Sequence, residues 1–153
     1  MTARWPIRCP TRLYDRWPLD RGRRSSGGSP VNVYPPGSNT ATPVPRDYLS
    51  YLRALAAHGV KLTDQATTTV DGHPAALFTI NTDQSVDGAF GCPAAGMSAG
   101  DCYGPQPTLS QRFAVIDLGN RVMVAWLRNI KGTDSTAKNA SFEQMLRSIH
   151  FKA

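Results

Sequence analysis

The stretch QRFAVIDLGNRVMVAWL, residues 111–127, decides the fold of this chain. Residues 111–118 and 121–127 are apolar runs separated by Gly119-Asn120, which favours a tight hairpin turn. Each run carries apolar residues at both alternating sets of positions, so both of its faces are apolar. A strand with one solvated face alternates apolar and polar residues instead. The pattern therefore predicts two central strands covered on both sides.

A second hairpin precedes this one. Residues 61–70 are rich in Thr and Val and end at Asp71-Gly72, a dipeptide typical of a two-residue hairpin turn. Residues 75–81 follow, with Ala76, Phe78 and Ile80 on one face. We expect these two segments to pair as antiparallel strands.

Two amphipathic helices flank the four predicted strands. The first spans about 45–58, carries the stripe Tyr48, Leu49, Leu52, Leu55 and Ala56, and ends before Gly59. The second begins at 136 or 141, ends near 148, and carries the stripe Phe142, Met145, Leu146 and Ile149. These elements predict an α+β fold: an antiparallel sheet of about four or five strands with two packed helices, in the order α-β-β-β-β-α. The predicted buried residues are Leu52, Phe78, Ile116, Val124 and Leu146.

Residues 1–43 differ in composition from the rest of the chain. Residues 1–30 hold seven arginines against two aspartates, whereas the remaining 123 residues hold ten basic and nine acidic residues. The net charge of +6 therefore belongs mainly to this Pro-rich segment, in which Ser25-Ser26-Gly27-Gly28-Ser29 resembles a flexible linker. We predict a boundary at residue 44: 1–43 is disordered or a misassigned start, and 44–153 is a single α+β domain. Within 1–43, the alternating stretch Val31-Asn32-Val33-Tyr34, which ends at Pro35, is compatible with an edge strand. Because the folded part is nearly neutral, we expect no nucleic-acid partner.

The N-terminal segment lacks the apolar run of a signal peptide, and no stretch approaches the roughly 20 apolar residues of a membrane span. Taken literally, the chain is cytoplasmic. If its N-terminus is incomplete, the chain is extracytoplasmic, either secreted or membrane-anchored through the missing part.

The loop 82–110 holds Cys92 and Cys102 on either side of PAAGMSAGD. Closing this ring is sterically easy, so we predict a disulfide between them. Two free thiols are the alternative. We expect no metal site, because the two cysteines lack the spacing of zinc ligands and no histidine is near them in sequence. Cys9 has no assigned role.

Several segments together resemble the C-terminal portion of actinobacterial secreted or lipid-anchored envelope proteins: TVDGHPAALFTI (69–80), the Cys-containing loop, RFAVIDLGNRVMVAW (112–126) and FEQMLRSIHF (142–151). The resemblance is to the PsbP/Mog1-like group, which includes LpqN-like lipoproteins. It implies an extracytoplasmic binding or accessory module. Members of that group begin with a signal peptide or anchor and then N-terminal strands, which residues 1–30 do not supply.

No catalytic pattern emerges from the remaining polar residues. The three histidines are scattered, no serine lies in a Gly-x-Ser-x-Gly elbow, and no phosphate loop is present. We therefore expect a non-enzymatic envelope binding domain without a cofactor, whose partner is a protein or a small apolar ligand. The alternatives are a small enzyme or metal-dependent hydrolase using the 82–110 loop, and a basic-tailed nucleic-acid-binding protein. The candidate ligand-binding residues are Asp71, His73, Asp101, Tyr103 and Trp126, although Trp126 also suits the core.

Overall fold

The computed structural model describes residues 25–152. Within that range the chain forms eight strands, two α-helices and two short 3-10 helices. In chain order they are β1 (Ser25–Gly28), β2 (Asn32–Tyr34), β3 (Thr42–Pro43), α1 (Tyr48–Ala54), η1 (Leu55–His58), β4 (Val60–Val70), β5 (His73–Thr82), β6 (Ala89–Cys92), η2 (Ala99–Asp101), β7 (Leu109–Asp117), β8 (Val122–Ile130) and α2 (Thr136–Arg147).

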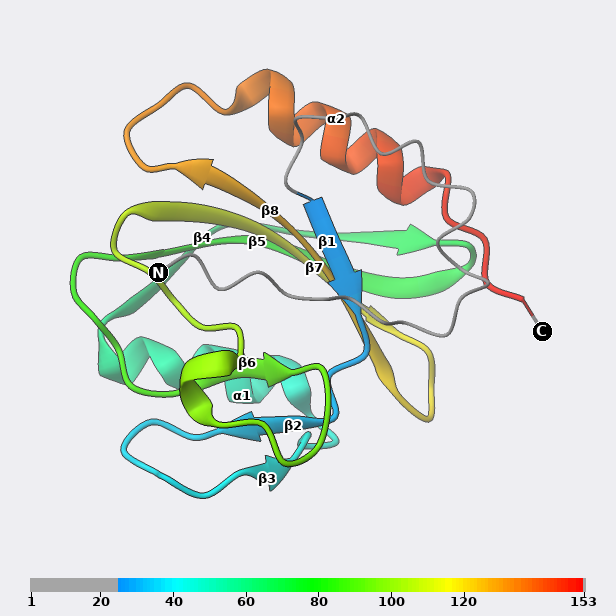
Figure 1. The fold of residues 1–153 in the computed structure, drawn as a ribbon. Helices are drawn as coiled ribbons and strands as arrows, with labels where there is room; N and C mark the ends of the chain where they lie inside the picture. The colour runs from blue at the N-terminus through cyan, green and yellow to red at the C-terminus, as the bar shows by residue number, and fades with distance from the viewer. Residues whose placement is uncertain (1–24, 153) are drawn as a thin grey trace.

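The strands form two antiparallel sheets. The larger has the order β1-β8-β7-β5-β4, and the smaller has the order β3-β2-β6. The helix α2 covers one face of the large sheet, while α1 and the small sheet lie against the other face (Figure 1). The predicted α+β class, the antiparallel sheet and the two packed helices are confirmed.

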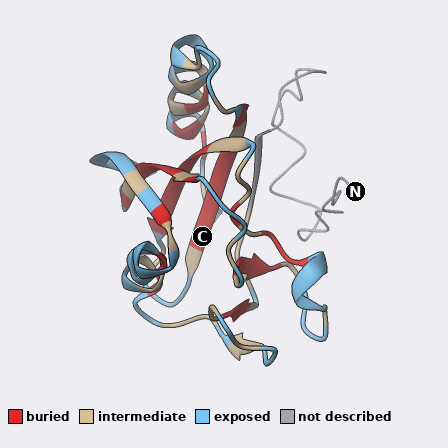
Figure 2. Ribbon diagram, turned by 90° about the vertical axis from the view of Figure 1, so that its left-hand side faces the viewer, coloured by how far each residue is buried: buried red, intermediate tan, exposed pale blue. Residues whose placement is uncertain are grey.

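The central strands are buried on both faces, as their two-faced apolar pattern predicts (Figure 2). Phe78, Phe113 and Trp126 lie in the core cluster that includes α1, whereas Ile116 and Leu127 lie in the cluster that includes α2. The five residues predicted to be buried are each at most 3% exposed: Leu52, Phe78, Ile116, Val124 and Leu146.

Local chemistry explains the ends of several elements. Asp71 and Gly72 both adopt positive φ, +50° and +78°, as a primed two-residue turn between β4 and β5 requires. The Asp47 carboxylate caps α1 by accepting a 2.9 Å hydrogen bond from the backbone N–H of Ser50. Gly59, with φ +89°, ends η1 in the left-handed conformation.

The predicted boundary at residue 44 is wrong for residues 25–43. This part of the chain supplies β1 to the large sheet and β2 and β3 to the small one. β2 lies within the alternating stretch 31–34, but it is the central strand of the small sheet rather than an edge strand. β1 and β3 form because partner strands provide backbone hydrogen bonds that composition does not reveal. The predicted 82–110 loop likewise contains β6, which pairs with β2. The disorder predicted for residues 1–24, and Cys9 among them, lies outside the described residues.

Candidate functional site

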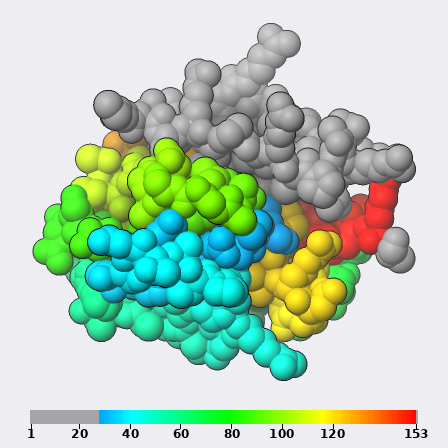
Figure 3. All heavy atoms as spheres, turned by 60° about the horizontal axis from the view of Figure 1, so that its bottom comes forward, coloured from blue at the N-terminus to red at the C-terminus, as the bar shows by residue number. Residues whose placement is uncertain are grey.

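A disulfide organises the loop beside the small sheet. Cys92 and Cys102 are joined, with their Cα atoms 4.6 Å apart, which confirms the predicted pairing. The disulfide brings Tyr103 back alongside Gly91, where the two backbones form a bridge with hydrogen bonds of 3.0 and 3.4 Å. On the surface, the loop lies beside the β2–β3 segment (Figure 3), and the Tyr34 hydroxyl donates to the Met97 carbonyl at 2.7 Å.

Tyr103 joins an aromatic cluster contributed by five parts of the chain. Its ring stacks on that of Trp126 with centroids 4.7 Å apart, and Trp126 in turn stacks on Phe113 at 6.1 Å. Phe90 meets Phe113 edge-on at 5.1 Å. The Tyr48 hydroxyl of α1 donates to the Phe90 carbonyl at 2.7 Å, so the helix is fixed to the cluster by a buried hydrogen bond.

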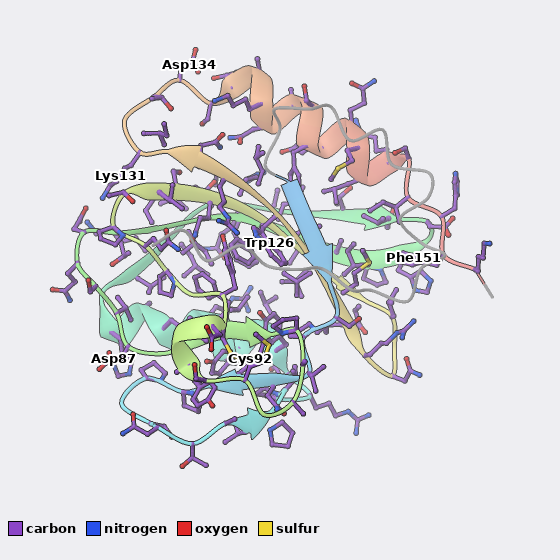
Figure 4. The ribbon with its side chains drawn as sticks, viewed as in Figure 1. Asp87, Cys92, Trp126, Lys131, Asp134 and Phe151 are labelled. Atoms are coloured by element: carbon purple, nitrogen blue, oxygen red, sulfur yellow. A yellow bond between two sulfur atoms is a disulfide. The ribbon has the colours of Figure 1, made fainter. Side chains whose placement is uncertain are left out.

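This cluster surrounds a small cavity between the two sheets. The cavity has a volume of about 10 Å³ and is almost entirely apolar. Trp126 lies in the interior between β8 and β6 (Figure 4). The segment Gly28–Pro30 closes the cavity, and Gly91 permits the close approach, because a Cβ there would lie 2.6 Å from the Cβ of Pro30. The lining residues are Gly28, Pro30, Tyr48, Phe90, Gly91, Tyr103, Phe113, Val124 and Trp126.

The titratable groups that line the cavity are phenols, and they remain protonated near neutral pH. Burial raises the pKa of the Tyr48 hydroxyl well above its ordinary value of 10. Burial also raises the pKa of Tyr103, although Arg128, whose guanidinium lies 5.0 Å from the centre of the Tyr103 ring, acts in the opposite direction. The Gln111 amide donates to the Tyr103 hydroxyl at 2.8 Å. The cavity is thus suited to hold an apolar group rather than to transfer protons near neutral pH.

The five predicted ligand-binding residues fall into separate places. Tyr103 and Trp126 meet in the aromatic cluster. Asp101 is exposed on η2, where its carboxylate accepts a 2.6 Å hydrogen bond from the Ser98 hydroxyl. Asp71, in the β4–β5 turn, and His73, directly after the turn, both contact the C-terminal segment instead.

At that turn, Asp71 holds the end of the chain against the sheet. Its carboxylate accepts a 2.7 Å hydrogen bond from the backbone N–H of Phe151 and lies 3.2 Å from Nδ1 of His150. The rings of His73 and Phe151 meet edge-on at 5.3 Å. The contacts of Asp71 lower its pKa, and the hydrogen bond from Phe151 does so most strongly. Asp71 and His73 therefore have a structural role, in which they attach the C-terminal segment to the sheet.

A second, shallower hollow of about 380 Å³ lies at the end of η1. The 82–110 loop contributes Gln84, Ser85 and Asp87 to it, and His58 faces them from η1. Asp87 and Phe151 lie at opposite sides of the molecule (Figure 4). The lining is mainly polar and open to solvent, so this hollow lacks the enclosure that binding pockets usually provide.

Sequence reasoning missed most of the cavity wall. The sequence pattern places Tyr48 in the helix stripe and Gly28 in a linker, and it marks neither Phe90 nor Pro30. The cysteine pair is the available signal, because a bond between Cys92 and Cys102 brings the next residue, Tyr103, close to Gly91. Which rings Tyr103 then meets depends on pairings between distant segments.

Within residues 25–152, no three His, Cys, Asp or Glu side chains lie close enough together to hold a metal ion. No helix in that range has the length and apolar character needed to cross a bilayer.

Comparison with known proteins gives little further information. No protein-family model matches the chain, and no curated protein does. A solved structure of a protein of unknown function, PA94 from Pseudomonas aeruginosa, is similar with a TM-score of 0.46 and 13% identity. The match covers 91% of this chain and 88% of that one. At this level the similarity supports no statement about function.

Proposed function

We propose that this chain is a non-catalytic binding or accessory domain that works outside the cytoplasm, in the cell envelope, and that its aromatic cavity receives an apolar group. The observation that carries the proposal is the cavity itself. Rings from four strands or loops and one helix converge on it, and the described residues that line it include no carboxylate, imidazole or thiol. As it stands the cavity has room for about one water molecule, so an apolar group enters by displacing part of the wall and binds mainly by burying its apolar surface.

The disulfide supports the extracytoplasmic part of the proposal. Disulfides persist in oxidising compartments and are rare in the cytosol. Cys92 and Cys102 are only 1% and 8% exposed, so the bond is shielded from reductants once the domain has folded. The protein isolated from its own cells with acid quenching and thiol alkylation should carry this bond in nearly every molecule. Recovery with both thiols free would contradict the proposed location.

Apolar binding can be tested with fluorobenzene and the full chain. Its addition should shift the NMR signals of the Trp126 indole N–H and the Tyr103 ring, since both line the cavity. Val124→Leu adds a methylene to the lining and should weaken binding at least ~5-fold by occupying the space. Val122→Leu is the matched control, because Val122 lies on the same strand and packs in the same cluster without lining the cavity.

Two results would overturn the proposed site. One is the absence of any shift at millimolar fluorobenzene. The other is equal weakening in Val124→Leu and Val122→Leu, which would mean that the probe binds elsewhere or that the fold has loosened generally.

A further inference from the structure

The strand that closes the cavity is unusual in composition. β1 reads Ser-Ser-Gly-Gly and pairs antiparallel with β8 along its whole length. Glycine weakens a strand because it loses the most backbone entropy on folding and supplies no side chain for packing. β1 is also an edge strand of only four residues. This composition and edge position predict that β1 separates from β8 more readily than β7 does.

The register places position 28, where glycine has no side chain, at the cavity. Gly28 lies opposite Val124, and residues directly opposite in an antiparallel pair project to the same face. Val124 and Trp126 both line the cavity, and so does Gly28. The hollow thus lies where a larger residue at position 28 would place its side chain.

The volume of the cavity limits what can enter while β1 stays in place. About 10 Å³ is the space of roughly one water molecule. An organic group can enter only if Gly28–Pro30 moves away. A free small molecule that displaced β1 would leave the backbone groups of β8 without their present partners, so a probe such as fluorobenzene binds only weakly, in the millimolar range. An incoming strand would restore those hydrogen bonds, and its side chain opposite Val124 would occupy the hollow together with the space that Pro30 vacates.

We propose that β8 accepts an extended segment of a partner protein in place of β1, with a large apolar side chain opposite Val124 that fills the aromatic cavity. This inference rests on the proposed function, because it names the class of ligand that the cavity takes. Strand replacement conserves the hydrogen-bonded ladder and adds the burial of a side chain that Gly28 lacks.

The side chain of Arg128, beside the cavity, adds a preference for an acidic residue in the partner segment. Arg128 follows Trp126 by two residues on β8, so it projects to the same face, and its guanidinium lies over the Tyr103 ring. In the register of β1, the position opposite Arg128 lies four residues before the one opposite Val124. The preferred segment therefore has an acidic residue, three intervening residues and then a large apolar residue.

The test uses the full-length protein and the blocked peptide Glu-Thr-Val-Thr-Leu-Thr. We expect it to shift the amide signals of residues 124–128 and to speed hydrogen exchange at residues 25–28, which it displaces. A peptide with Gly in place of Leu should bind at least ~10-fold more weakly, because it buries no apolar side chain. A peptide with Lys in place of Glu should also bind more weakly.

Variants of β1 separate cavity filling from general strengthening of the strand. Gly28→Ala places one methyl group in the hollow of about 10 Å³, fills it from within the chain and should weaken binding of the Leu peptide about 4-fold. Gly27→Ala is the matched control, because position 27 lies opposite Ala125 and projects to the other face. Gly27→Ala removes the same backbone freedom as Gly28→Ala, but the cavity stays open.

The outcomes distinguish this inference from the proposed function. Fluorobenzene binding without peptide binding would overturn strand replacement and leave the cavity as a site. If neither ligand binds, both proposals fall. Equal binding of the Leu and Gly peptides, or equal loss in Gly28→Ala and Gly27→Ala, would overturn the role of the side chain in the cavity.

Discussion

Arg112 shows how a single charged residue is accommodated inside the molecule. Its side chain is 8% exposed and ion-pairs with Glu143 of α2 at 2.9 Å. It also donates to the Asp64 carbonyl at 2.8 Å. Asp64 has φ +50° at an irregularity in β4, and its carbonyl is available to Arg112 there. Arg112 therefore ties α2 to the edge of the sheet.

Removing the acid of this pair should destabilise the fold. Glu143→Ala leaves the buried guanidinium without its counter-ion and should cost about 1–3 kcal/mol in the free energy of unfolding. Lys61→Ala is the control, because the Lys61–Asp83 pair is 66% and 63% exposed and should contribute little. Denaturant titration of both variants gives the comparison. A stability loss as small for Glu143→Ala as for Lys61→Ala would show that Arg112 is satisfied without Glu143.

Asp71 makes the attachment of the C-terminal segment sensitive to pH. Its pKa is lowered below the ordinary 3.8, mainly by the hydrogen bond from Phe151 and then by His150. A carboxylate whose pKa falls on folding stabilises the folded state above its ordinary pKa, and that contribution is lost as the pH falls through the lowered value. The Phe151 amide signal should therefore titrate with a midpoint below 3.8 and move toward its unstructured position in acid.

Asp71→Asn provides the comparison for this titration. Asparagine tolerates the positive φ at this position but carries no charge, so the pH dependence of the Phe151 signal should disappear. A midpoint at or above 3.8 in the unaltered protein would show that the hydrogen bond does not favour the ionised carboxylate.

At the level of elements, the disulfide determines where the loop after β6 returns. Replacing both cysteines by serine removes an eleven-residue ring, and on loop-entropy grounds should cost about 2–3 kcal/mol of unfolding free energy. The Tyr103 ring should also lose its fixed position on Trp126, since the bridge to Gly91 depends on this return. Chemical denaturation and the NMR signals of the Trp126 indole measure the two effects. Unchanged stability would mean that the bridge alone holds the loop.

Elements with a strong internal pattern were predictable from the sequence. β7 and β8 carry apolar residues on both faces, and Asp71-Gly72 specifies a two-residue turn, so the central strands and the first hairpin follow from local chemistry. The strand β1 was not predictable, because Ser-Ser-Gly-Gly has no preference for extended structure. Pairing with β8 imposes that conformation, and tertiary context overrides propensity.

The candidate site was predictable only in part for the same reason. Tyr103 and Trp126 were identified singly, but their contact needs the disulfide, the bridge to Gly91 and the position of β8. Phe90 lies in a glycine-rich stretch without periodicity, and only the pairing of β6 with β2 places its ring against Phe113. Residues that converge from several elements leave no pattern along the chain.

At the scale of the whole molecule, two deletions at the N-terminus should differ in their effect on the thermal midpoint. The proline content and lack of periodicity of residues 1–24 predict that their removal leaves the thermal midpoint nearly unchanged. Removing residues 1–29 also deletes β1, which exposes the edge of β8 and the side of the cavity that Gly28 lines. The longer deletion should therefore lower the thermal midpoint by several degrees and increase binding of an apolar dye.

The same pair of deletions tests how β1 competes with an incoming strand. If β1 occupies the edge of β8 that the partner needs, removing β1 removes the competition. The peptide Glu-Thr-Val-Thr-Leu-Thr should then bind more tightly, by the factor by which β1 pairing weakens its binding to the full chain. The peptide should also restore part of the lost thermal midpoint, because it binds the folded state only. The protein lacking residues 1–24 keeps β1 and should bind the peptide as the full chain does. Equal peptide affinity for both deletions would show that β1 and the peptide occupy different edges.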